Sequence, residues 1–132
     1  MSNIIQVNIK KVFENYRDNE ERLNELLSKI TESKMYENNI HIYYSDKVKE
    51  GEKINHEIHE IRKLRRDIYL RNLLFTILNE EERQIVVLKF EENMRVYDIA
   101  SSLYMSPSTY YRRLDKLCTK LNSYYKSFSF LF

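Results

Sequence analysis

The chain has 132 residues, and its 22 basic and 20 acidic side chains leave a formal net charge of only +2. One glycine and one proline leave few helix breakers, so the composition favours a mostly helical protein of one domain or a small domain with an extension. The single cysteine, Cys118, excludes an internal disulfide and a cysteine-cluster metal site, and we interpret it as a packing residue. No signal peptide and no apolar run of about 18 residues is present, so we expect a cytoplasmic protein without membrane contact.

Residues 8–33 are predicted to form a charged amphipathic helix. Apolar side chains recur every seven residues, and a second row between them is interrupted by Asn19; the two rows comprise Ile9, Tyr16, Leu23 and Ile30, then Val12 and Leu26. Such a face indicates helix pairing, either within the chain or between the subunits of a homodimer, and one more core-facing helix is the alternative. Residues 34–53 are polar and turn-prone, so we interpret residues 1–53 as an N-terminal helix followed by a connection.

Residues 54–78 are predicted to form a second long, connecting helix with Ile58, Ile61 and Leu64 on its apolar side. It carries a basic cluster of Arg62, Lys63, Arg65 and Arg66. This cluster could contact phosphates, but Glu57, Glu60 and Asp67 lie nearby in the sequence, so we favour a solvated helix face.

His56 and His59 are the two histidines of the connecting helix, and they do not form a zinc-protease motif. They are three residues apart, whereas that motif needs a spacing of four to place both ligands on one helix face. The sequence therefore predicts no metal site and no cofactor.

Residues 79–126 are predicted to form the functional domain. Asn79 is a good N-cap residue, and Glu80, Glu81 and Glu82 place acids in the first turn, with Glu82 at the capping-box position. The helix that starts there should end near residues 92–93. Beyond it, residues 127–132 form an apolar tail, which we expect to fold back on the core or to dock on another subunit.

Two short helices joined by a tight turn are predicted within residues 96–117. The first has an apolar side of Val96, Ile99, Ala100 and Leu103. Ser106 followed by Pro107 is a strong helix start, and the helix beyond it has an apolar side of Tyr110, Leu114, Leu117 and Leu121. Tyr104 stands where glycine is common in such turns, because a left-handed backbone is often needed there.

The second of these helices presents hydroxyl groups and cations on its other side. Residues 110–126 carry five basic side chains against one acid, whereas residues 79–95 carry three against five. Donors on one face and an apolar stripe on the other are typical of a helix-turn-helix whose recognition helix, residues 107–121, enters a major groove. An ordinary helical hairpin with a solvated basic face is the alternative.

Residues 78–121, which contain LNEEERQIVVLKF, DIASSLYMS and PSTYYRRLDKL, resemble region 4 of bacterial sigma factors. The run LYMSPSTYYRRLDKL looks most similar to the ArpU/RinA-type regulators of Gram-positive phages and prophages, small sigma-like proteins associated with late-gene transcription. The resemblance implies an all-α fold with base or phosphate contacts from the helix after the turn. It does not extend to a core-binding sigma region, so it does not imply a full sigma factor.

We therefore expect a sequence-specific regulator of transcription that binds double-stranded DNA, in a bacterial host and associated with its nucleoid. Arg112 is the expected base contact. The predicted DNA-binding residues are Ser106, Ser108, Thr109, Tyr111, Arg112, Arg113 and Lys116. RNA polymerase and a second copy paired through the N-terminal helix are further candidate partners. The alternative is an adaptor that docks on RNA polymerase or another regulator without reading DNA; no combination of nucleophile, base and orienting group indicates an enzyme.

Overall fold

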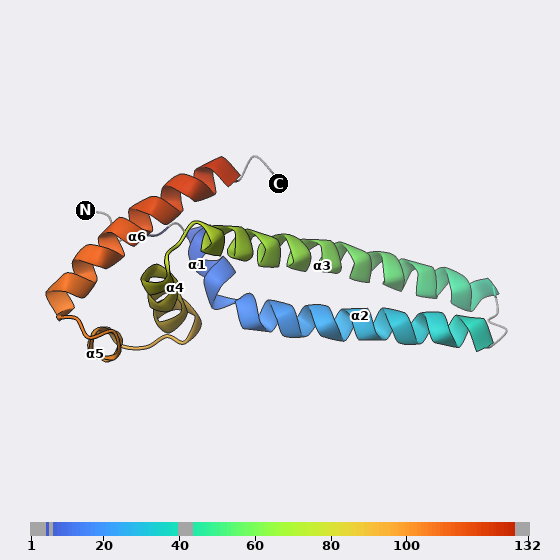
Figure 1. Ribbon diagram of the computed structural model, residues 1–132. Helices are drawn as coiled ribbons and strands as arrows, with labels where there is room; N and C mark the ends of the chain where they lie inside the picture. The colour runs from blue at the N-terminus through green and yellow to red at the C-terminus, as the bar shows by residue number, and fades with distance from the viewer. Residues whose placement is uncertain (1–4, 6, 40–43, 129–132) are drawn as a thin grey trace.

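The computed structural model describes residue 5, residues 7–39 and residues 44–128, with side chains described outside residues 32–54. Within these residues the fold is helical and contains no strand, which confirms the predicted all-α class (Figure 1). The elements are α1 (Val7–Glu14), α2 (Tyr16–Asn39), α3 (Tyr44–Thr76), α4 (Glu80–Val86), the π-helix η1 (Val87–Glu91), α5 (Val96–Ser102) and α6 (Pro107–Phe128). In Figure 1, α2 and α3 form a long antiparallel hairpin that projects from a head made of the other helices.

The single helix predicted for residues 8–33 is interrupted at Asn15. The Asn15 N–H donates to the Lys11 carbonyl at 2.9 Å, and the Asn15 carbonyl accepts from the Asn19 N–H at 2.7 Å, so one residue closes α1 and opens α2. The break separates two apolar sets with different partners. Ile9, Val12 and Phe13 of α1 enter the core of the head, whereas the apolar side chains of α2 face α3.

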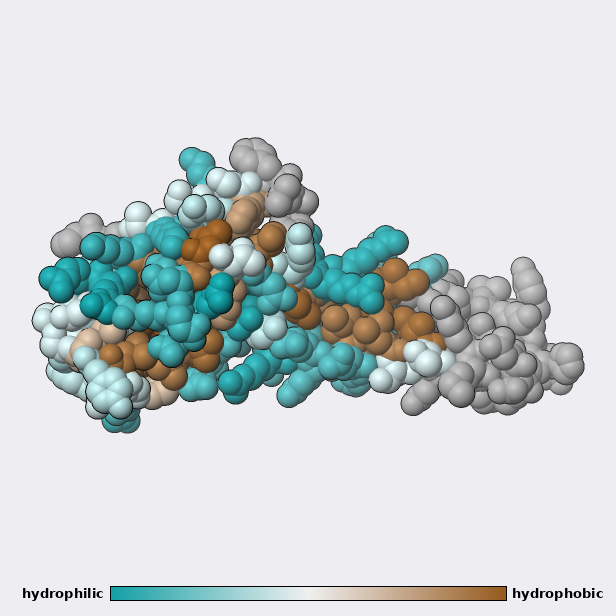
Figure 2. Space-filling view, in the orientation of Figure 1, coloured by the Kyte–Doolittle hydropathy of each residue, from teal (hydrophilic) through white to brown (hydrophobic). Residues whose placement is uncertain are grey.

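The heptad face of α2 pairs within the chain. Leu26 is fully buried against Ile61 and Leu64 of α3, and Leu23 and Ile30 pack beside them. Figure 2 shows this hydrophobic seam between two hydrophilic flanks. The apolar face that was predicted to pair within the chain or in a homodimer is therefore covered by α3 of the same chain.

The polar connection predicted for residues 34–53 is mostly helical, which corrects the prediction. α2 extends to Asn39 and α3 begins at Tyr44, ten residues before the predicted start of the connecting helix, with Gly51 inside it. Lysine and glutamate, which favour helix, make up half of residues 44–53, so the turn signals of Gly51 and the asparagines do not decide the conformation of this segment. Residues 40–43 lie outside the described residues, as do residues 129–132 of the apolar tail, whereas Phe128 packs on the core of the head.

The core of the head is organised around α1, which brings Phe13 between the end of α3 and η1. The Phe13 ring centroid lies 6.0 Å from that of Phe75 and 5.8 Å from that of Phe90. Cys118 is buried in the same core, as predicted, and burial raises the pKa of its thiol to about 11. None of the helices in the described part of the chain is both long and apolar enough to cross a bilayer.

The predicted capping box at the start of α4 is confirmed. The Asn79 side chain accepts from the Glu82 N–H at 2.8 Å, and the Glu82 carboxylate accepts from the Asn79 N–H at 2.9 Å. Arg83 then donates to the Phe75 carbonyl at the end of α3 at 2.8 Å, and the same carbonyl accepts from the Leu78 N–H at 3.1 Å. η1 continues α4 as a widened turn and ends at Glu91, close to the predicted end, and Asn93 two residues later takes a φ of 54°.

A buried ion pair joins the hairpin to the head. The Arg71 guanidinium of α3 donates twice to Glu91 of η1, at 2.8 and 3.0 Å, and the two side chains are only 12% and 4% exposed. The same guanidinium lies over the rings of Tyr16 and Phe75, 3.7 and 3.6 Å from their centroids. Because these contacts come from α2, α3 and η1, Arg71 holds three elements together.

We predict that Arg71→Met lowers the free energy of unfolding by about 3 kcal/mol, because it leaves the Glu91 carboxylate buried and unpaired. Combining Arg71→Met with Glu91→Leu should restore most of that loss, since an apolar pair no longer carries a buried charge. Urea denaturation measures both effects.

Arg17→Met is the matched control for this prediction. Arg17 pairs with the neighbouring Glu92 at 3.5 Å, but both side chains are well exposed, so a loss below about 1 kcal/mol is expected. An equal loss from Arg17→Met and Arg71→Met would contradict the special role of the buried pair.

Tyr110 supplies a second stability prediction. It is fully buried, and its hydroxyl has no hydrogen-bond partner among the described residues. Burial raises its pKa to about 12, so folding favours the neutral phenol and stability is lost as the pH rises from 10 through 12. Tyr110→Phe should raise the free energy of unfolding by about 1 kcal/mol at pH 7, with a larger gain at pH 11.

Denaturation at both pH values measures this gain, and Tyr124→Phe is its control. Tyr124 is 42% exposed, so its hydroxyl is hydrated in the folded and the unfolded state and little change is expected. A loss of stability in Tyr110→Phe would show that the hydroxyl does have a partner.

Candidate nucleic-acid interface

The start of α6 has the predicted cap. The Ser106 hydroxyl accepts from the Thr109 N–H at 3.2 Å, and Pro107 occupies the first helical position, where no backbone donor is needed. The same hydroxyl donates to the Thr109 hydroxyl at 2.9 Å and lies 3.2 Å from that of Ser108. Three of the predicted DNA-binding side chains therefore form one hydroxyl cluster at the beginning of the helix.

The turn between α5 and α6 is closed by two backbone hydrogen bonds. The Met105 N–H donates to the Ala100 carbonyl at 3.0 Å, and the Tyr104 N–H donates to the Ser101 carbonyl at 3.2 Å. This pattern is a Schellman motif, which needs a left-handed residue at the position of Tyr104. Tyr104 has a φ of 56°, so this tyrosine adopts the left-handed backbone that such turns usually give to glycine, and its side chain is 97% exposed.

One side of α6 is buried, as predicted. The buried residues on it are Tyr110, Leu114, Leu117, Cys118 and Leu121. With about 3.6 residues per turn, the middle of the opposite side falls at Arg112, flanked by Ser108 and Lys116. All three are exposed, and no ion pair with another described residue engages Arg112 or Lys116.

Two further cations of α6 lie between these sides and face α4. Arg113 forms an ion pair with Glu81, and Lys120 pairs with Glu82 at 3.1 Å. The acids in the first turn of α4 therefore have a second role, because they also fix the position of α6. Arg113 was predicted to contact DNA, and in this structure its guanidinium is engaged by the protein instead.

Exposed tyrosines occur on both α5 and α6. The predicted Tyr111 is 45% exposed, and its ring meets that of Tyr110 edge-on with centroids 5.6 Å apart. Tyr97, at the start of α5, is 75% exposed and was not singled out from the sequence. No periodicity signals such a residue, because it belongs to neither the apolar stripe nor the basic face.

The described residues contain no group of three or more histidine, cysteine, aspartate or glutamate side chains that could hold a metal ion. His41 lies outside them, and His56 and His59 sit on α3, away from the interface at α6. Chemistry at the interface therefore rests on hydroxyl groups, arginine, lysine and tyrosine. These groups bind phosphates and base edges through hydrogen bonds.

Comparison with known proteins places the chain in a family. Residues 37–122 match the family described as a protein of unknown function, DUF1492. The chain belongs to this family. The DUF1492 segment contains α3, α4, η1 and α5, together with α6 as far as Asn122, so it includes both the Arg71–Glu91 pair and the candidate interface. No curated protein and no solved structure matches the chain.

The left-handed Tyr104 provides a test of the turn. Tyr104→Gly should raise the free energy of unfolding by about 1 kcal/mol, because glycine adopts this backbone conformation without the steric penalty of a Cβ atom. Thermal or urea denaturation measures the gain.

Tyr97→Gly is the matched control, since the same replacement inside α5 should cost about 1 kcal/mol. Loss of stability in both variants would show that the Tyr104 ring makes a stabilising contact despite its exposure.

Proposed function

We propose that this DUF1492 chain is a sequence-specific, double-stranded DNA-binding regulator of transcription of the phage or prophage type. In this proposal α5, the turn and α6 act as a helix-turn-helix, and α6 lies in the major groove. The resemblance of residues 78–121 to sigma region 4, and of the turn and α6 to ArpU/RinA-type regulators, supports it.

The proposal rests on one observation: two cations of α6 form ion pairs with α4, and two others do not. Arg113 and Lys120 are held by acids of α4, whereas Arg112 and Lys116 extend from the outward side without an ion pair among the described residues. Paired cations fix the helix on its support. Unpaired cations on the opposite side remain available for base edges and phosphates.

Arg112 is the best base contact because it lies in the middle of the outward side. Arginine binds guanine through two hydrogen bonds, and one good contact discriminates by about 1–3 kcal/mol. Ser108 and Lys116 flank Arg112 and are suited to phosphates, as are the hydroxyl groups of Ser106 and Thr109 at the helix start. A single module of this size binds weakly, so cooperation with RNA polymerase or a second copy is part of the proposal.

An adaptor that docks on RNA polymerase is the second candidate, and one observation favours it. A mainly apolar groove of about 500 Å³ lies where α4, η1 and α5 meet the end of α3, with Phe75, Val87, Leu88 and Leu103 in its lining. An amphipathic helix of a partner fits such a surface. Gln84→Arg at the groove rim should weaken binding to purified RNA polymerase and leave DNA selection unchanged if the chain is an adaptor.

The test of DNA reading is selection from randomised duplexes at two salt concentrations. The wild type should enrich a defined motif and bind less tightly at the higher salt. Arg112→Ala should relax one position of that motif and lower affinity for the best site by about 1–3 kcal/mol. Arg65→Ala, on α3 and outside the proposed helix-turn-helix, is the matched control and should keep the full motif.

Arg113→Ala tests whether Arg113 contacts DNA or instead positions α6 through Glu81. Because Arg113 is engaged by Glu81, its loss should lower stability or weaken binding to all sequences, without relaxing one position. Failure of the wild type to enrich any motif would overturn the proposal of an autonomous reader.

A further inference from the structure

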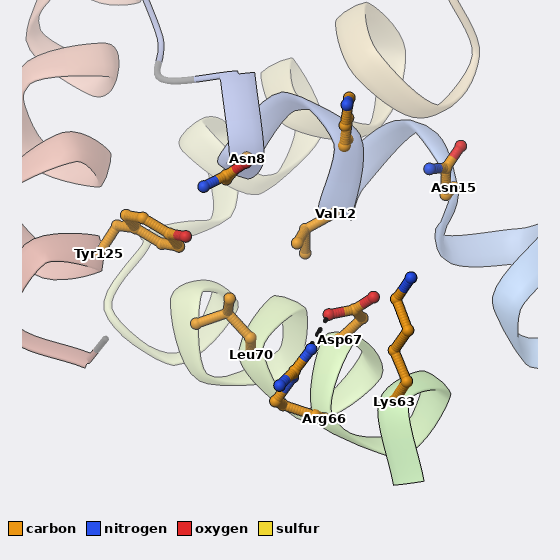
Figure 3. Close-up of a pocket in the computed structure, with 9 residues that line it drawn as sticks. Asn8, Val12, Asn15, Lys63, Arg66, Asp67, Leu70 and Tyr125 are labelled. Atoms are coloured by element: carbon orange, nitrogen blue, oxygen red, sulfur yellow. Dashed lines mark ion pairs between the residues drawn. The ribbon is translucent and has the colours of Figure 1, made fainter. Parts of the chain in front are cut away.

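A second polar site lies on the other side of the head, between α1, α3 and α6. It is a groove of about 490 Å³, within the size range of small-molecule sites. In Figure 3, side chains from the three helices point into the same space. The groups that can donate hydrogen bonds to a ligand there are Asn8, Lys11, Asn15, Lys63, Arg66 and Tyr125.

The groove is positively charged. It contains three cations and a single carboxylate, that of Asp67. Asp67 pairs with Arg66 at 4.0 Å, the outer limit of an ion pair, while Lys11 and Lys63 have no ion pair with another described residue. Positive charge contributed by two facing helices and left largely uncompensated favours an anionic ligand. Lys63 and Arg66, two of the four cations in the basic cluster predicted on the connecting helix, therefore line this groove.

The floor of the groove is apolar. Val12 and Leu70 are 8% and 7% exposed, and the partly buried ring of Tyr125 closes one end. A DNA duplex is too wide to reach a floor recessed between helices, so it would touch only the cations at the rim. A small ligand can contact the cations and the floor together.

We propose that this groove binds a nucleotide-sized ligand in which a phosphate or diphosphate is joined to an aromatic body. Lys11, Lys63 and Arg66 bind the phosphate oxygens, and the side-chain amides of Asn8 and Asn15 donate further hydrogen bonds. The aromatic body lies against the Tyr125 ring and the apolar floor.

This site is independent of DNA reading. Tyr125 follows Arg112 by thirteen residues, which places it about 220° around α6, on nearly the opposite side. The ligand and a duplex therefore do not compete for the same surface. A ligand held by α1, α3 and α6 also stabilises the docking of these helices, because it binds only when they are together.

Calorimetric titration of the full chain with adenosine diphosphate, inorganic phosphate and adenosine tests the proposal. Adenosine diphosphate should bind most tightly and raise the melting temperature, and inorganic phosphate should compete with it. Lys63→Gln and Arg66→Gln should each weaken binding of adenosine diphosphate about tenfold. Arg62→Gln and Arg65→Gln remove equal charge from exposed positions of the same helix outside the groove, so they should change affinity by less than about twofold.

Three outcomes would overturn the proposal. The first is no binding of adenosine diphosphate at millimolar concentration to wild-type chain whose helical circular dichroism is intact. The second is an equal loss in all four variants, which would indicate a general charge effect. The third is unchanged nucleotide binding in Lys63→Gln together with weaker duplex binding, which would assign these cations to DNA.

Discussion

The contact between Arg71 and Glu91 is the constraint on which the rest of the structure depends. It is almost completely buried, and the rings of Tyr16 and Phe75 lie against the same guanidinium. One cation thereby joins the start of α2, the end of α3 and η1. Because η1 continues α4 without a break, the long hairpin determines how the helix that supports α6 is oriented. Because the pair is buried, loss of either side chain would leave the other charge without water or a partner, which is strongly destabilising.

Two ion pairs connect α4 to α6. Glu82 both completes the capping box with Asn79 and pairs with Lys120, while Glu81 pairs with Arg113. Two of the three consecutive acids, Glu81 and Glu82, therefore contact α6 as well as standing in the first turn of α4. Two cations of α6, Arg113 and Lys120, therefore contact α4, whereas Arg112 and Lys116 face outward.

The head thus presents two polar surfaces on different sides of the same helix. The outward side of α6 has exposed hydroxyl groups and cations, the groups that the proposed contact with DNA phosphates and bases requires. The groove beside Tyr125 combines cations with a recessed apolar floor, which suits a small ligand. Since α1 and α3 form the walls of that groove, a ligand there acts on the same junction that Arg71 stabilises.

The features that the sequence by itself determined are those decided by neighbours within about four residues. They are the cap at Ser106 and Pro107, the capping box at Asn79 and the apolar stripe of α6, each of which rests on local hydrogen bonds or helical spacing. Tertiary structure alone decided the break at Asn15, because the residues on its two sides pack against different partners. It also decided the pairs of Arg71 with Glu91 and Arg113 with Glu81, and the groove, since each depends on groups brought together from distant parts of the chain.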